Sequence, residues 1–162
     1  MSSKQLLFRL VLCFAAIYAL AALAALGSAG APEFYAALTR PAWAPPAWLF
    51  GPVWTLLYSM IAIAAFLLWR AMPAGPWLTS AVLFALQLVL NVLWSWLFFA
   101  WHLGAWALVD IVLLIVVLLV GVSGYWRHQS RVAVLLMVPY IGWVGFAAML
   151  NFSVWQLNPT ML

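Results

Sequence analysis

The sequence contains very few charged side chains. Only 5% of its 162 residues are charged, two acids and six lysines or arginines, whereas 70% are hydrophobic. Globular chains carry about 25% charged residues and are about half apolar. A soluble domain so poor in charge could not cover its own surface, and a disordered chain needs the opposite composition. The composition excludes both classes and indicates a membrane protein.

Cysteine and histidine are almost absent. The single cysteine, Cys13, cannot form an internal disulfide, and its apolar surroundings favour a role as a small packing residue. His102 and His128 are too few and too far apart for a metal site. The six basic residues form no stripe that could follow a phosphate backbone, so the net charge of +4 does not indicate a nucleic-acid partner.

Long uncharged stretches are what the sequence does have. There are 29 uncharged residues between Arg40 and Arg70, and 39 between Arg70 and Asp110. A helix needs about 20 apolar residues to cross a bilayer. With the longer stretch broken by Pro73, Gly75 and Pro76, the pattern predicts an all-α integral membrane protein, a five-transmembrane-helix bundle in one domain. The expected spans are residues 6–26, 46–69, 77–101, 105–126 and 132–157, the last with a kink at Pro139.

Residues 27–45 are expected to form a loop between the first two spans. Its prolines make it stiff, and Pro46 suits the first position of the second helix. The first span also has the basic start and small-residue end of a signal peptide, but its apolar stretch exceeds the usual length of about 7–15 residues, which favours a retained span. Its pairs Ala15–Ala19 and Ala21–Ala25 would allow close helix approach.

The basic residues predict the orientation. With five spans, only Arg40 falls on the side opposite the N-terminus; the other side holds Lys4, Arg9, Arg70, Arg127 and Arg131. Because basic loops stay in the cytoplasm, we expect the N-terminus inside and the C-terminus outside. A bacterial cell membrane is the expected location.

The twelve tryptophans divide by depth. Eight fall near the expected ends of spans, where indoles anchor at the membrane interface: Trp43, Trp48, Trp69, Trp77, Trp101, Trp106, Trp126 and Trp155. Trp96 points away from the polar stripe of the third span and is expected to face lipid or another subunit. Trp54, Trp94 and Trp143 lie deeper, in the outer half of the bilayer or near its middle.

Polar side chains accompany these deep tryptophans at helical spacing. They are Tyr58 in the second span, Gln87, Asn91 and Ser95 in the third, and Tyr140 and Asn151 with Ala147 in the fifth. Polar groups in hydrocarbon face the bundle interior, so the three faces should converge. Two interpretations remain open. The groups could be interhelical hydrogen bonds that hold the helices together. They could instead form an aromatic pocket, in which Asn91 and Tyr140 would suit a conjugated ring system.

Asp110 is the only acid inside a span. Such carboxylates are functional candidates by default. It lies near the outer end of its helix, where we expect it to accept hydrogen bonds from indoles or a loop. A proton relay would need a second intramembrane acid, and the sequence has none.

Five pieces of sequence, in order, resemble the translocator protein family, also known as the tryptophan-rich sensory proteins, TspO/MBR or peripheral-type benzodiazepine receptors. The resemblance covers residues 10–158. The pieces are Phe34-Tyr35 with Arg40–Pro46, Val53–Tyr58, Gln87–Asn91 with Trp94-Ser95, Ala107–Asp110, and Pro139–Asn151.

The resemblance implies a five-helix bundle, usually a homodimer, that binds porphyrins such as protoporphyrin IX and haem. It also implies isoquinoline carboxamide and benzodiazepine-type ligands, sterols in animal members, and no required cofactor. Tyr35 and Trp43 would belong to a loop that closes the pocket. The pocket itself would be lined by Trp54, Tyr58, Asn91, Trp94, Trp143, Ala147 and Leu150.

One departure concerns sterol. Phe152 and Gln156 stand where the family's proposed sterol motif has a tyrosine and a base, so sterol binding through this motif is not expected. Three functions compete. The protein could be a porphyrin receptor, sensor or carrier. It could degrade porphyrin in light, with Trp54 and Trp143 as its catalytic residues. It could be an ion-coupled transporter, against which the lone carboxylate and the lack of internal repeats argue.

Overall fold

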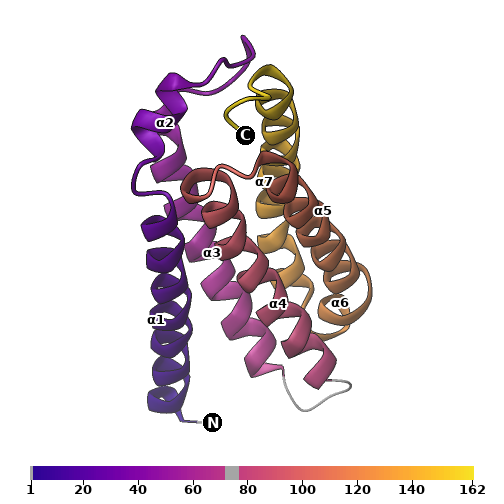
Figure 1. Ribbon diagram of the computed structural model, residues 1–162. Helices are drawn as coiled ribbons and strands as arrows, with labels where there is room; N and C mark the ends of the chain where they lie inside the picture. Colours follow the sequence, from indigo (N-terminus) through magenta and orange to yellow (C-terminus); the bar gives the residue numbers. More distant parts are fainter. Residues whose placement is uncertain (1, 72–76) are drawn as a thin grey trace.

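In the part of the chain that the structure describes, five long helices pack side by side (Figure 1). The computed structural model describes residues 2–71 and 77–162, so the expected helix breakers Pro73, Gly75 and Pro76 lie outside the described residues. The long helices are α1 (Ser3–Gly27), α3 (Phe50–Arg70), α4 (Trp77–Ser95), α5 (Gly104–Val120) and α7 (Arg131–Leu157). The expected five-helix bundle is therefore confirmed, and all five helices are long and apolar enough to cross a membrane.

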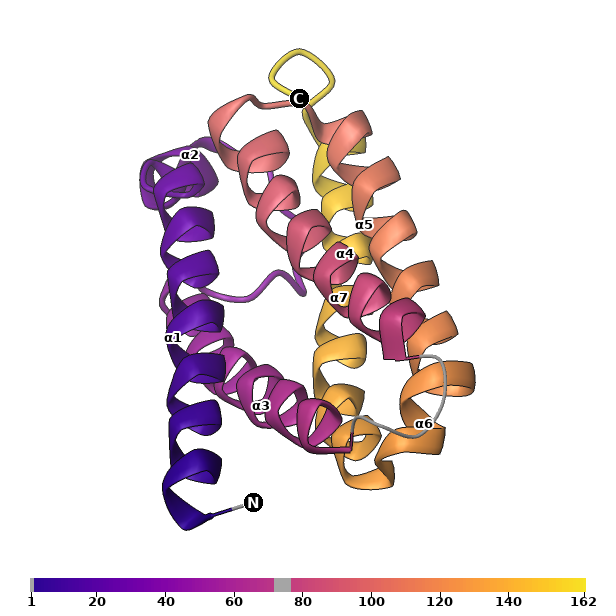
Figure 2. The same cartoon turned by 90° about the horizontal axis from the view of Figure 1, so that it is seen from below.

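The helices do not contribute equally to the bundle. Helix α7 packs against α3 and α5, and α4 packs against α5. Helix α1 lies at the edge, where it contacts α3 and α4 (Figure 2). Helix α7 continues through Pro139, which lies inside it.

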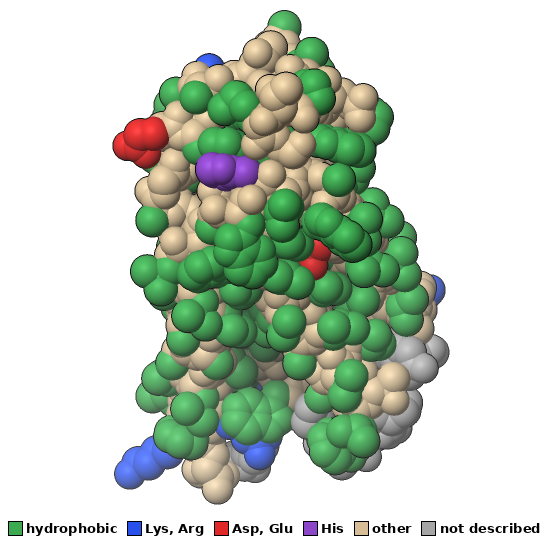
Figure 3. Space-filling view, viewed as in Figure 1, with side chains coloured by type: hydrophobic (Ala, Val, Ile, Leu, Met, Phe, Trp, Pro, Cys, Tyr) green, Lys and Arg blue, Asp and Glu red, His purple; other side chains and the backbone are tan. Residues whose placement is uncertain are grey.

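The side chains separate into a core and an apolar exterior. Ile61 and Ala62 of α3 and Leu118 of α5 are wholly buried, whereas Leu56 and Val116 on the same two helices are more than half exposed. Apolar side chains cover the middle of the face in Figure 3, and most of its Lys and Arg side chains lie at the end where α1 begins. Such an apolar belt fits the hydrocarbon core of a bilayer, and the polar ends fit its headgroup regions.

Two helices change geometry near their ends. Helix α4 ends in a π-helical segment, η2 (Trp96–Ala100). Helix α5 continues as a second one, η3 (Gly121–Tyr125), followed by the short α6 (Trp126–Gln129). At Gly121 an added Cβ would lie 2.6 Å from the Trp126 ring, so only glycine allows this indole to pack against the helix backbone.

The segment between the first two spans is not simply a loop, contrary to expectation. It contains the short helix α2 (Ala31–Ala37), in which Pro32 lies in the first turn together with Glu33. Both residue types suit a helix start, proline because it needs no donor there and the acid because of the helix dipole. Pro46 does not open α3, which begins at Phe50; it precedes a single turn of 3₁₀ helix, η1 (Ala47–Leu49).

Two tryptophans make contacts that the sequence did not indicate. Trp126, expected at the interface, is wholly buried, and its Nε1 donates to the Ser80 carbonyl oxygen at 3.2 Å. Trp96, expected to face lipid or another subunit, is partly exposed but also packs against α1. Its Nε1 donates to the Leu23 carbonyl oxygen at 3.0 Å, and its ring fills the space beside Gly27. An indole N–H in hydrocarbon needs an acceptor, and the neighbouring helix provides one.

Candidate functional site

A cavity of about 520 Å³ lies between α1, α3, α4 and α7, with α2 and η1 at one end. This volume is in the range of small-molecule sites, about 300–1,000 Å³. Helix α1 and the turn after it contribute Tyr18, Ala21, Ala22, Ala24, Ala25 and Ser28. The other lining residues are Ala31, Pro32, Tyr35, Ala47, Phe50, Gly51, Trp54, Thr55, Tyr58, Trp94, Ser95, Phe99, Trp143 and Ala147.

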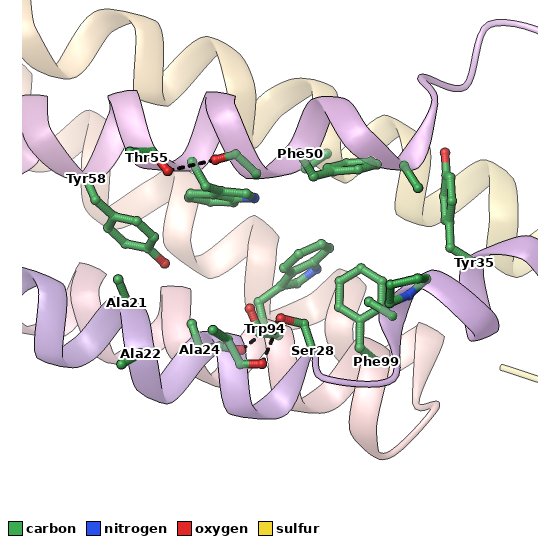
Figure 4. A pocket seen from close by; sticks show the side chains of 18 of the residues that line it. Ala21, Ala22, Ala24, Ser28, Tyr35, Phe50, Thr55, Tyr58, Trp94 and Phe99 are labelled. Carbon is green, nitrogen blue, oxygen red and sulfur yellow. Dashed lines mark hydrogen bonds between the residues drawn. The ribbon is translucent and has the colours of Figure 1, made fainter.

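Most of the side chains predicted to bind ligand line this cavity. They are Tyr35, Trp54, Tyr58, Trp94, Trp143 and Ala147. The three polar and aromatic faces expected to converge do meet here. Figure 4 shows Phe50 and Tyr58 on α3, with Ala21 and Ala24 of α1 opposite them. The cavity therefore has an aromatic wall and a facing wall of small side chains.

Asn91, Tyr140 and Leu150 lie behind this wall rather than in it. All three are buried, and the Asn91 Oδ1 accepts a hydrogen bond of 2.7 Å from the Tyr58 hydroxyl. The Tyr140 ring meets the Trp54 ring edge-on, with centroids 6.3 Å apart. Asn91 of α4 and Tyr140 of α7 thus hold two of the cavity-lining rings in place, and Leu150 of α7 lies in the core.

Trp43 is also outside the cavity. Its side chain is 48% exposed, and its ring packs edge-on against Phe146, 5.8 Å between centroids. Phe146 in turn packs on Trp143, 5.4 Å away. Trp43 thus reaches the site only through two further rings, because the segment after α2 runs over α7 and not across the cavity.

The rings that line the cavity pack in separate groups. Tyr35 of α2 packs edge-on against Phe50, and Phe50 against Trp143, with centroids 5.5 and 5.9 Å apart. Deeper in α3, Trp54 stacks on Tyr58 at 5.3 Å. Offset and edge-on ring pairs of this kind make rigid apolar surfaces. A flat aromatic body could lie against them with little rearrangement.

Interhelical hydrogen bonding, the other open interpretation, occurs as well. The Trp94 Nε1 donates to Asn151 Oδ1 at 3.1 Å, and Asn151 Nδ2 donates to the Gly104 carbonyl oxygen at 3.0 Å. This chain joins α4, α7 and the start of α5. Trp94 therefore serves both roles, since its N–H holds helices together while its ring lines the cavity.

Helix α1 provides a wall of the cavity that was not predicted from the sequence. Ala21 and Ala25 were expected to permit close helix approach, but they line the cavity, where their small side chains leave volume. Near the same wall, the Tyr18 hydroxyl lies 2.8 Å from the Ser59 Oγ of α3. The available signal was two pairs of alanines, Ala21-Ala22 and Ala24-Ala25, that follow Tyr18, and alanine has no chemistry of its own.

The cavity carries no formal charge. Of the described residues that line it, none is Lys, Arg, His, Asp or Glu. Its polar atoms are hydroxyls, indole N–H groups and backbone. Among the described residues there is also no cluster of His, Cys, Asp and Glu that could hold a metal ion. Such a lining suits an apolar, conjugated ligand body.

Tyr35 lies at one end of the cavity. It is 4% exposed, and its hydroxyl donates to the Pro45 carbonyl oxygen at 3.0 Å. Burial raises the pKa of this hydroxyl above its usual value, and the nearby Arg40 offsets part of the rise. The phenol therefore remains protonated at neutral pH and keeps its donor role.

Asp110 does not behave as expected from the sequence. It is buried on α5, but its Oδ2 has no hydrogen-bond partner among the described residues, whether indole or loop. Asp110 is not among the residues that line the cavity.

Comparison with known proteins shows extensive similarity. The sequence profile of the TspO/MBR family matches residues 10–156. The chain is 41% identical to the tryptophan-rich protein TspO of Chlorobaculum tepidum over 127 residues, which cover 78% of this chain and 80% of that one. It is 39% identical to the tryptophan-rich protein TspO of Archaeoglobus fulgidus over 77% of this chain and 80% of that one. It is 40% identical to the translocator protein of Ovis aries over 78% of this chain and 75% of that one.

Proposed function

The chain belongs to the TspO/MBR family and is an integral, multi-pass membrane protein, and on that premise we propose that its cavity binds porphyrins. The observation that carries the proposal is the uncharged cavity of about 520 Å³ with its packed rings. A tetrapyrrole is a flat conjugated ring whose faces would stack on Trp54 and Phe50. Isoquinoline carboxamides and benzodiazepines offer smaller flat surfaces of the same chemistry and would compete for it.

The proposed role is that of a receptor, sensor or carrier, with protoporphyrin IX or haem as ligand and no cofactor required. For haem, no described lining residue is a His, Cys or Met. These side chains are the usual axial ligands of haem iron, and tyrosine is a rarer one. The hydroxyls of the three tyrosines in the lining, Tyr18, Tyr35 and Tyr58, already form hydrogen bonds within the protein. Binding would then depend on the porphyrin ring and not on its metal, so metal-free protoporphyrin should bind about as well as haem.

The test is a titration of purified protein with protoporphyrin IX in darkness, read by quenching of tryptophan fluorescence. Two alanines of α1 give a matched pair of variants. Ala21 lines the cavity, whereas Ala19 is exposed and does not. Ala21→Phe should fill part of the cavity and weaken binding, whereas Ala19→Phe should bind like the parent. Equal affinities for both variants would place the porphyrin elsewhere.

A second candidate function is light-dependent porphyrin degradation. It is favoured by one observation, that Trp54 and Trp143 both line the cavity. Both indoles would contact a bound porphyrin, and an indole in contact with the excited ring can give up an electron, with dioxygen as the final oxidant. Absorbance of bound porphyrin, followed in light and in darkness, separates a binder from an enzyme.

The remaining expectations are part of the proposal. We place the protein in a bacterial cell membrane as a homodimer, with the N-terminus inside and the C-terminus outside. Lipid surrounds it, and sterol is a weak partner at most because its motif is incomplete. We assign no nucleic-acid partner.

A further inference from the structure

The proposed ligand carries charge that the cavity cannot accommodate. Protoporphyrin IX has two propionate groups on one edge of its ring, and they are ionised at neutral pH. Placing a carboxylate in an apolar cavity without a partner is costly. Since none of the described lining residues is a cation, the acidic edge of the ligand must lie outside the cavity.

A second hollow lies beside the end of the cavity at which Tyr35 lies. It has a volume of about 410 Å³ and is lined by Leu38, Arg40, Pro41, Ala44, Pro45 and Pro46. Tyr35 connects the two spaces. Its ring lines the cavity, its hydroxyl donates to the Pro45 carbonyl oxygen, and the Arg40 guanidinium carbon lies 4.7 Å from its ring centroid. Only the Tyr35 ring thus separates Arg40 from the cavity.

Among the described residues, Arg40 is also the only lysine or arginine at this end of the bundle; the other basic side chain here, His102, stacks on Phe34 of α2 with ring centroids 4.0 Å apart. Lys4 and Arg9 lie near the start of α1, Arg70 ends α3, and Arg127 and Arg131 lie in α6 and at the start of α7. All five lie at the opposite ends of the spans. Arg40 is exposed, so it can exchange water for a ligand carboxylate. Its planar guanidinium can bind both carboxylate oxygens while it stays stacked on the tyrosine.

We propose that Arg40 and the hollow beside it form an anion subsite that holds a carboxylate of the ligand whose ring lies in the cavity. The inference rests on the proposed function and adds the class of ligand, namely a flat apolar ring with an acid on one edge. The ring would stack within the cavity, and its acidic edge would pass Tyr35 to reach Arg40. Arg40 would select acidic porphyrins over uncharged ones.

The experiment compares two ligands that differ only in charge. Protoporphyrin IX and its dimethyl ester are titrated in darkness against the parent, Arg40→Gln and Arg40→Lys, with Arg70→Gln as the control at the opposite end of the bundle. Arg40→Gln should weaken the diacid about 5- to 20-fold, the range of charge-assisted contacts at a partly exposed site. It should leave the ester within about 2-fold of the parent. Arg40→Lys should retain part of the diacid affinity, and Arg70→Gln all of it.

The other outcomes overturn the subsite in distinguishable ways. If Arg40→Gln weakens diacid and ester equally, Arg40 only positions Tyr35. If it weakens neither while both bind the parent, the carboxylates lie elsewhere and the proposed function stands without this subsite. If neither porphyrin binds the parent, the proposed function fails and the subsite with it. Circular dichroism of each variant shows that it is folded.

Discussion

The hydroxyl of Tyr58 donates a hydrogen bond of 2.7 Å to the Oδ1 of Asn91, which joins the aromatic wall of the cavity on α3 to the polar stripe of α4. Both side chains are buried, at 7% and 4% exposure. In hydrocarbon neither group has water as an alternative partner. The bond therefore fixes the position of a ring that lines the ligand space.

Removing one partner of this bond should cost more than removing both. Asn91→Leu leaves the Tyr58 hydroxyl buried without its acceptor and should lower the free energy of unfolding by about 1–3 kcal/mol. Tyr58→Phe combined with Asn91→Leu should recover part of that loss. Thermal unfolding in detergent measures both variants. If the double variant is less stable than Asn91→Leu alone, the hydrogen bond to Tyr58 is not the reason that Asn91 stabilises the protein.

The contact between Trp96 and α1 predicts a sharp effect at Gly27. A Cβ at Gly27 would lie 2.7 Å from the Trp96 Cδ1, closer than real contacts allow, whereas nothing lies within 4 Å at Gly30. Gly27→Ala should therefore push α1 away from α4 and destabilise the protein by about 1–3 kcal/mol. Gly30→Ala is the matched control and should be neutral. Because α1 forms a cavity wall, Gly27→Ala should also weaken porphyrin binding.

How much of this could be predicted from the sequence depends on the side chains concerned. The long uncharged stretches predict the five helices, and the depth of Trp54 and Trp143 with their polar companions predicts that their faces meet. Trp126 was misplaced because a residue's distance from a helix end says nothing of the face it occupies. The π-helical segment η3 before it adds a residue to the turn and shifts that face.

The wall formed by α1 could not be predicted from its residues. Alanine carries no polar or aromatic signal, so Ala21 and Ala25 are compatible with either tight packing or a cavity. Only the position of α1 at the edge of the bundle decides between them. Helix α2 was missed for another reason, since seven residues are too few for a clear periodicity and prolines surround it.

Ala147 gives the most direct test of the α7 wall. It is 7% exposed and lines the cavity. Ala147→Thr adds a branched, hydroxylated side chain to that surface. An overpacking cost of about 1–3 kcal/mol corresponds to an affinity loss of about 5- to 150-fold. Porphyrin titration measures it, with Ala148→Thr, which does not line the cavity, as the control. Unchanged affinity for Ala147→Thr would exclude this wall from the site.

The basic bias predicts the topology. In a Cys13→Ser background, a membrane-impermeant thiol reagent added to intact cells should label Ala42→Cys but not Ser3→Cys, both of which are exposed positions. Permeabilised cells should be labelled at both. If Ser3→Cys alone is labelled in intact cells, the N-terminus lies outside and the predicted orientation is wrong.

If light-driven porphyrin loss occurs, it should require two of the three indoles that line the cavity, Trp54 and Trp143. Trp54 and Trp143 line the cavity from α3 and α7, whereas Trp106 of α5 is 65% exposed on the outside of the bundle. Phenylalanine keeps an apolar ring but is far harder to oxidise than an indole. Trp54→Phe and Trp143→Phe should therefore keep most of the porphyrin affinity and slow photobleaching, because the electron donor in contact with the excited ring is gone. Trp106→Phe should bleach at the parent rate.

The measurement is the decay of the porphyrin absorbance band under fixed illumination, corrected for the bleaching of free porphyrin and for the fraction bound. Affinity measured in darkness separates lost binding from lost chemistry. If all three variants bleach porphyrin at the parent rate, Trp54 and Trp143 take no part. The protein is then a binder whose ligand is bleached by light alone. If either cavity variant slows bleaching at saturating ligand while Trp106→Phe does not, the chemistry belongs to the cavity and binding is only its first step.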